Sequence, residues 1–270
     1  MSYLVFIISV GLFALFGSGG PLHRDRWFHS LNDRVDALEL DIWPSLLLRV
    51  LAPVLALWLS LALLDLFFGE LATGLAGVVV LYVAWGRGDY PTDIERFLAR
   101  ARVGDLEGAD MLLNERARQS DQNEANGSVG MRDFAYRGYS RWFPSVLYYL
   151  MLGPIAAITY RLVYLANERS DGRFEPAMRM LDWLPARLLL VTFSVLGDFE
   201  HTRRALTTEA FDQTISTDAL LAHGIERAWR VETEGQDEAE STVVAVEATQ
   251  KAINLSTAVW VAVVSVIALF

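Results

Sequence analysis

An acidic, an aromatic and a basic side chain stand close together in the stretch LDWLPARL, at Asp182, Trp183 and Arg187. An arginine guanidinium can bind a carboxylate or a phosphate through two parallel hydrogen bonds, so these residues point to an anionic ligand. The same stretch is typical of a helix start, because aspartate caps a first turn and proline lacks only an N–H that has no partner there. The sequence predicts a helix beginning near residue 183 with Asp182 as its N-cap, and leaves open whether these charges also form a ligand site.

Ionisable residues interrupt the apolar stretches of the chain at Arg49, Asp65, Arg161, Asp182 and Arg187. A charge near the centre of a membrane helix costs about 2.5–3.5 kcal/mol, so each needs a partner or a route to water. Arg49 and Asp65 lie near the ends of their segment and are expected to extend to the membrane boundary. Arg161 lies deeper, and we expect it to pair with an acid.

The charge balance and the residue types that are rare exclude several kinds of site. The chain has 33 acidic and 23 basic residues, a net charge of -10, which argues against a nucleic-acid partner because phosphate binding needs a basic surface. Lysine occurs only at Lys251, so the GK[ST] of a P-loop is absent from the sequence. With no cysteine and no HExxH spacing among the four histidines, no metal site, no catalytic residue and no cofactor are predicted.

Long apolar stretches predict a membrane protein: 53% of the residues are hydrophobic and the mean hydropathy is +0.29. A helix needs about 20 apolar residues to cross a bilayer core. Residues 45–86 predict a transmembrane hairpin with a turn at Gly69-Glu70. Further apolar segments are 1–16, which lacks the basic start of a signal peptide, the central region 142–196, which contains 142–166 and 183–196, and a C-terminal helix at 253–270. The predicted fold is all-α and polytopic, with four to six membrane segments.

Two polar regions separate these segments, and both predict helices. Residues 87–141 open with the capping box Thr92-Asp93-Ile94-Glu95 and place apolar residues at helical spacing. The apolar face contains Ile94, Phe97, Leu98 and Ala101. Gly104-Asp105 is expected to break this region into a helical hairpin, with a flexible loop at 120–130. Residues 197–252 predict another helical pair, interrupted at 234–240.

The distribution of arginines predicts the orientation of the chain in the membrane. Residues 87–141 carry nine arginines, which places this region in the cytoplasm by the positive-inside rule. Arg169, Arg173 and Arg179 would lie outside if residues 142–166 crossed the membrane. A bend at Gly153-Pro154 into two half-helices would keep both regions inside, provided that protein or a water-filled cavity surrounds the bend. The sequence leaves both arrangements open.

Several short motifs resemble those of a family of membrane proteins, the AmpE and CobD/CbiB proteins. LDWLPARL is similar to the family signature W-[VL]-P-A-R-L, and ARVGDLEGADMLL is similar to a segment in which Gly-Asp opens a helix. FPSVLYYLMLGPIAAITYRLVYLAN resembles the stretch APLFW…GxPGAxxYKxVN, with matching residues at Pro144, Gly153, Pro154, Tyr160 and Arg161. The resemblance covers roughly residues 45–270, including the downstream helices and the apolar tail.

The departures from the family distinguish its two branches. CobD/CbiB proteins are similar to amide-forming synthases and carry E-N-T-S-D-G before the APLFW segment, whereas residues 135–140 read AYRGYS in this chain. Tyr164 stands where an asparagine is expected, and Asn167 where an aspartate is. AmpE proteins lack the same acids and keep D-W-x-P-x-R-L. The resemblance therefore implies an AmpE-like protein of the bacterial inner membrane, linked to β-lactamase induction and peptidoglycan recycling, and adds Tyr160 and Asn167 to the candidate residues.

Three functions remain open on the sequence. The first is a non-catalytic signalling or sensor protein that contacts the lipid bilayer, has a possible protein partner and binds an anionic ligand. Its candidate ligand-binding residues are Tyr160, Arg161, Asn167, Asp182, Trp183 and Arg187. The alternative is a CobD/CbiB-like ATP-dependent amide-forming synthase with a remodelled site, which would use ATP and Mg²⁺ and acids such as Asp182, Glu168 and Asp171. A transporter is the third, favoured by the broken segment at Gly153-Pro154 but by no internal repeat.

Overall fold

The computed structural model describes residues 2–16, 26–85, 90–117, 129–170, 172–212, 214–231, 235 and 237–267. In these ranges every regular element is a helix, so the predicted all-α fold is confirmed for the described part of the chain. The helices form two compact units. The first holds Met1–Asp89 and Ser140–Met180, and the second holds Tyr90–Tyr139 and Leu181–Phe270.

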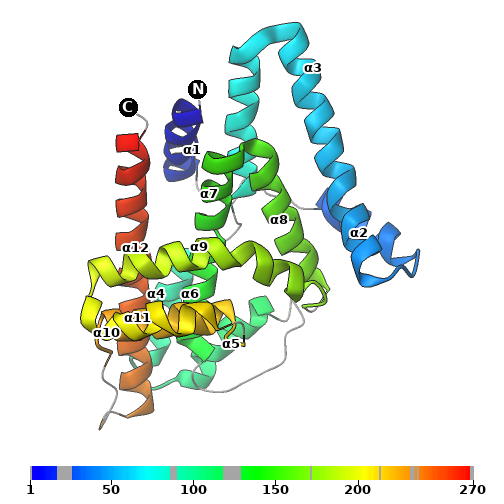
Figure 1. The fold of residues 1–270 in the computed structure, drawn as a ribbon. Helices are drawn as coiled ribbons and strands as arrows, with labels where there is room; N and C mark the ends of the chain where they lie inside the picture. Colours follow the sequence, from blue (N-terminus) through cyan, green and yellow to red (C-terminus); the bar gives the residue numbers. More distant parts are fainter. Residues whose placement is uncertain are drawn as a thin grey trace. The chain divides into compact units, whose positions relative to one another are not determined.

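The longest helix of the first unit, α3 (Ile42–Ala84), is the one described helix that is long and apolar enough to cross a membrane. It does not run straight, because Gly69 adopts φ 74° and ψ −174°, outside the helical region. Asp65 and Thr73 would lie about 12 Å apart along a straight helix. Instead, Thr73 Oγ1 donates to Asp65 Oδ1 at 3.1 Å. The chain therefore folds back at Gly69, where the sequence predicted a turn, and α3 is a hairpin of two arms (Figure 1).

The two arms of α3 differ in length, and the tip of the hairpin is uncovered. Residues 42–68 extend about 40 Å and residues 70–84 about 22 Å, so only the first arm is long enough for a membrane core of about 30 Å. The buried residues of α3 lie at its two ends, and none lies between 51 and 76. That stretch exposes Leu51, Leu55, Trp58, Leu59, Leu63, Leu66, Phe67, Phe68, Leu71 and Leu75. An apolar surface of this extent is typical of contact with lipid or with another protein.

The N-terminal apolar segment, α1 (Ser2–Phe16), packs along the second arm of α3. Ser9 Oγ donates to the carbonyl oxygen of Val78 at 3.4 Å. A Cβ at Gly77 would lie 3.6 Å from Val5, so the two helices approach each other closely at this glycine. α1 is therefore an integral part of the first unit.

The apolar stretch that was predicted to be broken forms two short helices, α7 (Phe143–Leu152) and α8 (Pro154–Arg169). Gly153 between them adopts φ 86° and ψ −172°, a conformation essentially restricted to glycine. α7 and α8 then lie side by side, with the rings of Tyr148 and Tyr160 5.9 Å apart (Figure 1). At about 15 Å and 24 Å, neither helix is long enough to cross a membrane core. Of the two arrangements that the sequence left open, the structure has the pair of half-helices, and the chain enters and leaves this pair at the same end.

A short amphipathic helix, α2 (Arg26–Asp36), covers the beginning of α3. Its buried residues Phe28, Asn32 and Val35 recur at helical spacing, while most of its other residues are exposed and polar. This helix was not predicted, and it places polar side chains against the first turns of an otherwise apolar helix.

The second unit begins with the predicted helical hairpin. α4 (Tyr90–Ala101) and α5 (Leu106–Ala117) are joined by a turn in which Gly104 adopts a φ of +81°. The predicted apolar face of α4 is buried, which confirms it. α6 (Val129–Ser140) follows, and most of the loop predicted at 120–130 lies outside the described residues. The remaining elements are α10 (Phe199–Thr207), the 3-10 turn η2 (Glu209–Phe211), α11 (Thr217–Ala228) and α12 (Glu238–Ile267).

One helix, α12, spans what was predicted as two segments, a polar one before residue 252 and an apolar one after it. Its polar half packs against α4 and α11, and Arg102 forms an ion pair with Glu247 at 2.6 Å. In its apolar half, Trp260 Nε1 donates to Thr192 Oγ1 at 3.0 Å. The polar and apolar halves of this one helix therefore contact different elements: the polar half contacts α4 and α11, and the apolar half contacts Thr192.

α9 (Glu175–Leu196) begins before the predicted helix, and the prediction that Asp182 caps an N-terminus is wrong. Asp182 lies in the helix interior, and the helix continues through Pro185. The true start is marked by Pro176, in the first turn, where proline is favoured. Pro185 removes one internal hydrogen bond, and burial of neighbouring side chains such as Leu189 offsets that loss.

The alanine substitution Gly69→Ala tests the turn of the α3 hairpin. We expect it to lower the free energy of unfolding by about 1–3 kcal/mol, because the backbone conformation at Gly69 is essentially restricted to glycine. An added Cβ would meet no atom within 4 Å, so the cost is conformational rather than steric. Gly74→Ala is the matched control, since Gly74 has equally open space and no positive φ. Denaturation in detergent micelles measures both variants, and equal effects would contradict the fold-back at Gly69.

Candidate functional site

The carboxylate of Asp182 is buried in the second unit, where two tyrosines of α6 bind it. Tyr136 Oη donates to Asp182 Oδ2 and Tyr139 Oη donates to Asp182 Oδ1, both at 2.9 Å. Both oxygens of the carboxylate therefore accept a hydroxyl, as a buried polar group requires. Asp182 is 1% exposed, so a ligand from solvent does not reach it in this structure. These contacts suit Asp182 to holding α6 against α9.

Arg187 and Trp183 lie one turn apart on α9 and bind each other. Arg187 Nη1 donates to the carbonyl oxygen of Trp183 at 2.9 Å, and its guanidinium carbon lies 4.6 Å from the Trp183 ring centroid. The attraction of a cation to an aromatic face contributes about 0.5–1 kcal/mol at an exposed site. Trp183 is exposed and Arg187 is half-buried, so this pair is accessible where Asp182 is not.

Tyr160 and Arg161 are buried side chains of α8, in the first unit. The Tyr160 ring packs near Tyr148, and the guanidinium carbon of Arg161 lies 5.5 Å from the Tyr164 ring centroid. An aromatic face therefore contacts Arg161, and the acid expected as its partner stays a prediction. Of the six candidate residues, the first unit contains Tyr160, Arg161 and Asn167, and the second contains Asp182, Trp183 and Arg187.

Asn167 shapes the turn between α8 and α9. Its Oδ1 accepts a hydrogen bond from the backbone N–H of Phe174 at 2.9 Å, and its carbonyl oxygen accepts from the N–H of Gly172 at 3.1 Å. The turn places the Phe174 ring against Arg49, whose guanidinium carbon lies 5.4 Å from the ring centroid. Asn167 therefore helps to hold the Phe174 ring against Arg49, a charged residue that lies far from it in sequence.

Arg49 is the centre of a polar cluster at the beginning of α3, the Arg49 cluster, made up of Asn32, Asp36, Ser45, Arg49 and Phe174. Arg49 Nε donates to Ser45 Oγ at 3.1 Å and Nη1 donates to Asn32 Oδ1 at 3.0 Å. Nη2 forms an ion pair with Asp36 Oδ1. The side chain of Arg49 is 1% exposed and that of Asp36 is 50% exposed. The expectation that Arg49 extends outward to water is corrected, because α2 covers it and supplies its counter-charge.

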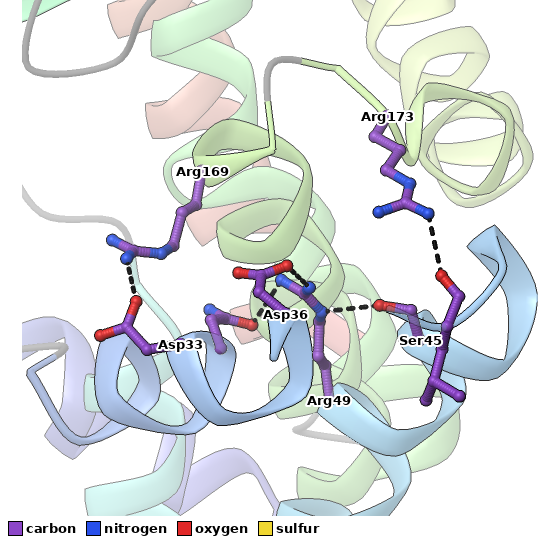
Figure 2. A network of polar contacts seen from close by, with 8 residues as sticks. Asp33, Asp36, Ser45, Arg49, Arg169 and Arg173 are labelled. Carbon is purple, nitrogen blue, oxygen red and sulfur yellow. Dashed lines mark hydrogen bonds and ion pairs between the residues drawn. The ribbon is translucent and has the colours of Figure 1, made fainter. Parts of the chain in front are cut away.

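Two exposed arginines from the α8–α9 region flank the Arg49 cluster (Figure 2). Arg169, the last residue of α8, forms an ion pair with Asp33 of α2. Arg173, in the turn, donates to the carbonyl oxygen of Leu40 at 3.0 Å. The α2–α3 corner is thus held by arginines at three points, and guanidinium groups are the natural partners of carboxylates and phosphates.

Sequence reasoning did not single out the residues of α2 in this cluster. The stretch RWFHSLNDRVD repeats Phe28, Asn32 and Val35 at helical spacing, and this pattern indicates an amphipathic helix. Asn32 and Asp36 pair with a residue 17 and 13 positions further on, and no local pattern predicts that pairing.

Two acidic residues at the surface of the second unit pair with arginines. Asp198 accepts from the backbone N–H of His201, and this hydrogen bond, with those from the His201 side chain and Arg230, holds the pKa of Asp198 well below its usual range. Burial raises the pKa of Glu209, but the hydrogen bond from Arg227 at 2.5 Å and its charge outweigh burial, so the net pKa is lowered. Both pairs connect residues near α10 with residues at the end of α11, and they therefore stabilise the fold.

The variant Tyr139→Phe tests the role of Asp182. It removes a hydroxyl donor from a buried carboxylate, so we expect it to lower the free energy of unfolding by about 1.5–3 kcal/mol. Tyr136→Phe is the matched control, because Tyr136 donates to the same carboxylate but is half-buried, whereas Tyr139 is fully buried. The smaller loss is expected for Tyr136→Phe, as measured by denaturation in detergent, and equal small losses would show that Asp182 does not depend on these bonds.

Comparisons with protein-family models, with curated proteins and with solved structures gave no match. Among the described residues, no group of three or more histidines or acids is placed to hold a metal ion.

Proposed function

We propose that this chain is an AmpE-like protein of the bacterial inner membrane, which takes part in signalling between cell-wall recycling and β-lactamase induction. In this role it binds an anionic ligand and contacts a protein partner, without catalysing a reaction. The observation that carries the proposal is the apolar hairpin of α3, because it requires an apolar environment that the other described residues do not supply.

Lipid suits this hairpin better than water does. Burying one leucine side chain contributes about 1.5–3 kcal/mol, and residues 51–76 expose leucines along their whole length. The charged residues near this surface, Asp65 and Glu70, lie beside the turn at Gly69, where the hairpin ends. The first arm therefore presents a continuous apolar surface that is long enough to reach across a membrane core.

The pair formed by α7 and α8 supports a cytoplasmic location for both arginine-rich regions. The chain enters α7 and leaves α8 at the same end of the pair (Figure 1). Residues 87–141, before the pair, and residues 167–180, after it, then lie on one side of a membrane. This arrangement agrees with the positive-inside rule, which a single crossing at 142–166 would violate.

The arginines support an anionic ligand. Arg187 is accessible beside Trp183, and Arg161 stays a candidate in the first unit. The guanidinium of Arg187 donates to the Trp183 carbonyl oxygen and contacts the Trp183 ring, and it carries further N–H groups that suit a carboxylate or a phosphate. The link to β-lactamase induction rests on the motif LDWLPARL and its resemblance to AmpE.

The membrane placement is tested by Leu59→Arg, in the middle of the exposed first arm. An arginine at the centre of a membrane helix costs about 2.5–3.5 kcal/mol, so we expect less protein in the membrane fraction and faster degradation. Val103→Arg is the matched control, because Val103 is also apolar and exposed but lies in the α4–α5 turn. If Leu59→Arg left the yield in the membrane fraction unchanged, the first arm would not lie in lipid.

The signalling role is tested with a β-lactamase reporter in a bacterium from which its own AmpE-type protein has been deleted. The wild-type chain should restore the reporter response, and Arg161→Ala and Arg187→Ala should reduce it at equal amounts of membrane-bound protein. Arg203→Ala, at an exposed position of α10, should behave as the wild type. A wild-type chain without effect would contradict the proposal.

The synthase alternative predicts a different result with the purified protein in detergent. Saturable ATP binding that requires Mg²⁺, and that Asp182→Ala and Arg187→Ala both abolish in a folded chain, would replace the proposal by the alternative. No binding at millimolar nucleotide leaves the signalling role in place.

A further inference from the structure

We propose that the Arg49 cluster is a carboxylate-binding site, which Asp36 occupies in this structure and from which a free carboxylate-bearing molecule displaces it. The inference deepens the proposed function by adding a candidate site to those at Arg161 and Arg187 and by naming the chemical class of its anion. It rests on that function only for the role of the anion as a signal.

The charge of the site comes from Arg49. A buried guanidinium needs a counter-charge, because an unpaired buried charge strongly destabilises a protein. In the described part of the chain, each nitrogen of Arg49 makes one hydrogen bond, to Ser45, Asn32 and Asp36. Since a guanidinium carries five N–H groups, Arg49 keeps further donors beside the one that binds Asp36.

Asn32 provides a second and independent observation. This residue is fully buried, and its Oδ1 accepts from Arg49, which fixes the orientation of the amide. Its Nδ2 has no hydrogen-bond acceptor within the described part of the chain. Buried N–H groups nearly always have an acceptor. The Asn32 amide is hydrogen-bonded to the Arg49 guanidinium through its Oδ1. A carboxylate oxygen bound to Arg49 would accept the hydrogen bond that Asn32 Nδ2 has to donate.

Asp36 has the features of a displaceable occupant. It is the last residue of α2, its side chain is 50% exposed, and one of its two oxygens contacts Arg49. The link that follows contains Glu39 at φ 48°, a left-handed conformation that is uncommon for residues other than glycine. A free carboxylate that binds Arg49 through both oxygens would make the stronger, bidentate contact.

Displacement of Asp36 would release the last turn of α2 while the helix stays attached. Asp33, one turn earlier, pairs with Arg169, and Phe28 is fully buried under the helix. The released residues therefore lie at 36–39, because the hydrogen bond from Arg173 to the Leu40 carbonyl oxygen still holds the chain just before α3. Occupancy of the site would change the link between α2 and the apolar arm, which gives a membrane-bound sensor a structural response.

The test uses the full chain in detergent micelles, with acetate as the probe and sodium chloride of equal ionic strength as the reference. Asp36→Ala removes the occupant and leaves Arg49 unpaired, so its melting temperature should fall below that of the wild type. Acetate should then raise this melting temperature by several degrees more than chloride does, because it replaces the missing carboxylate.

Two controls separate a site from a general salt effect. Asp33→Ala makes the same change of charge on the same helix, but its partner Arg169 is exposed, so acetate and chloride should act alike. Asp36→Ala combined with Arg49→Met lacks the guanidinium and should lose the preference for acetate. If Asp36→Ala does not fold, Asp36→Asn keeps the size of the side chain and takes its place in the same comparison.

The outcomes divide clearly. A preference for acetate in the Asp36 variant, absent from both controls, supports the site. An equal response to the two salts, or the same preference in the double variant, overturns it. A larger response to inorganic phosphate at equal ionic strength would overturn the assignment to carboxylates. The reporter assay is independent of this assay, so a failure of the site and a failure of the signalling role are distinguishable.

Discussion

The buried charge of Arg49 is the constraint on which the arrangement of the first unit depends. This guanidinium lies in the second turn of a helix that continues as an exposed apolar arm, where an unpaired charge would be costly. α2 neutralises it with Asp36 and contributes the amide oxygen of Asn32, and the α8–α9 turn covers it with Phe174. Three separate segments of the chain therefore meet at the beginning of the arm because one charge requires them.

Glycines in a conformation closed to other residues set the lengths of the apolar helices. Gly69 and Gly153 both combine a positive φ with an extended ψ, and each ends one helix and starts the next in the reverse direction. The second arm of α3, α7 and α8 are consequently too short to cross a membrane core, and the first arm of α3 is long enough. Residues 42–68 are thus the described segment that is long and apolar enough to cross a membrane.

Two buried charges of this chain are satisfied in different ways, and the difference bears on function. Asp182 accepts hydrogen bonds from two tyrosine hydroxyls, and a solvent-borne molecule does not reach it. Arg49 is equally buried, but its counter-charge Asp36 is half-exposed and lies at a helix end. A partner at the surface can exchange with a ligand, whereas a partner in the interior cannot. The geometry therefore favours an exchangeable anion at Arg49 over a ligand at Asp182.

The sequence by itself determined the features that depend on neighbouring residues. The apolar face of α4, the turn at Gly104 and the breaks at Gly69 and Gly153 were all predicted, because helical spacing and the conformational freedom of glycine are local properties. Tertiary structure decided the rest. The sequence suggested Asp182 as a cap, since aspartate is a favoured N-cap. In the structure α9 begins at Glu175, and the Asp182 carboxylate instead accepts from tyrosines more than forty positions earlier. In the same way, Arg49 became a buried charge only when α2 folded over it, because pairings between distant residues depend on packing that no short stretch of sequence contains.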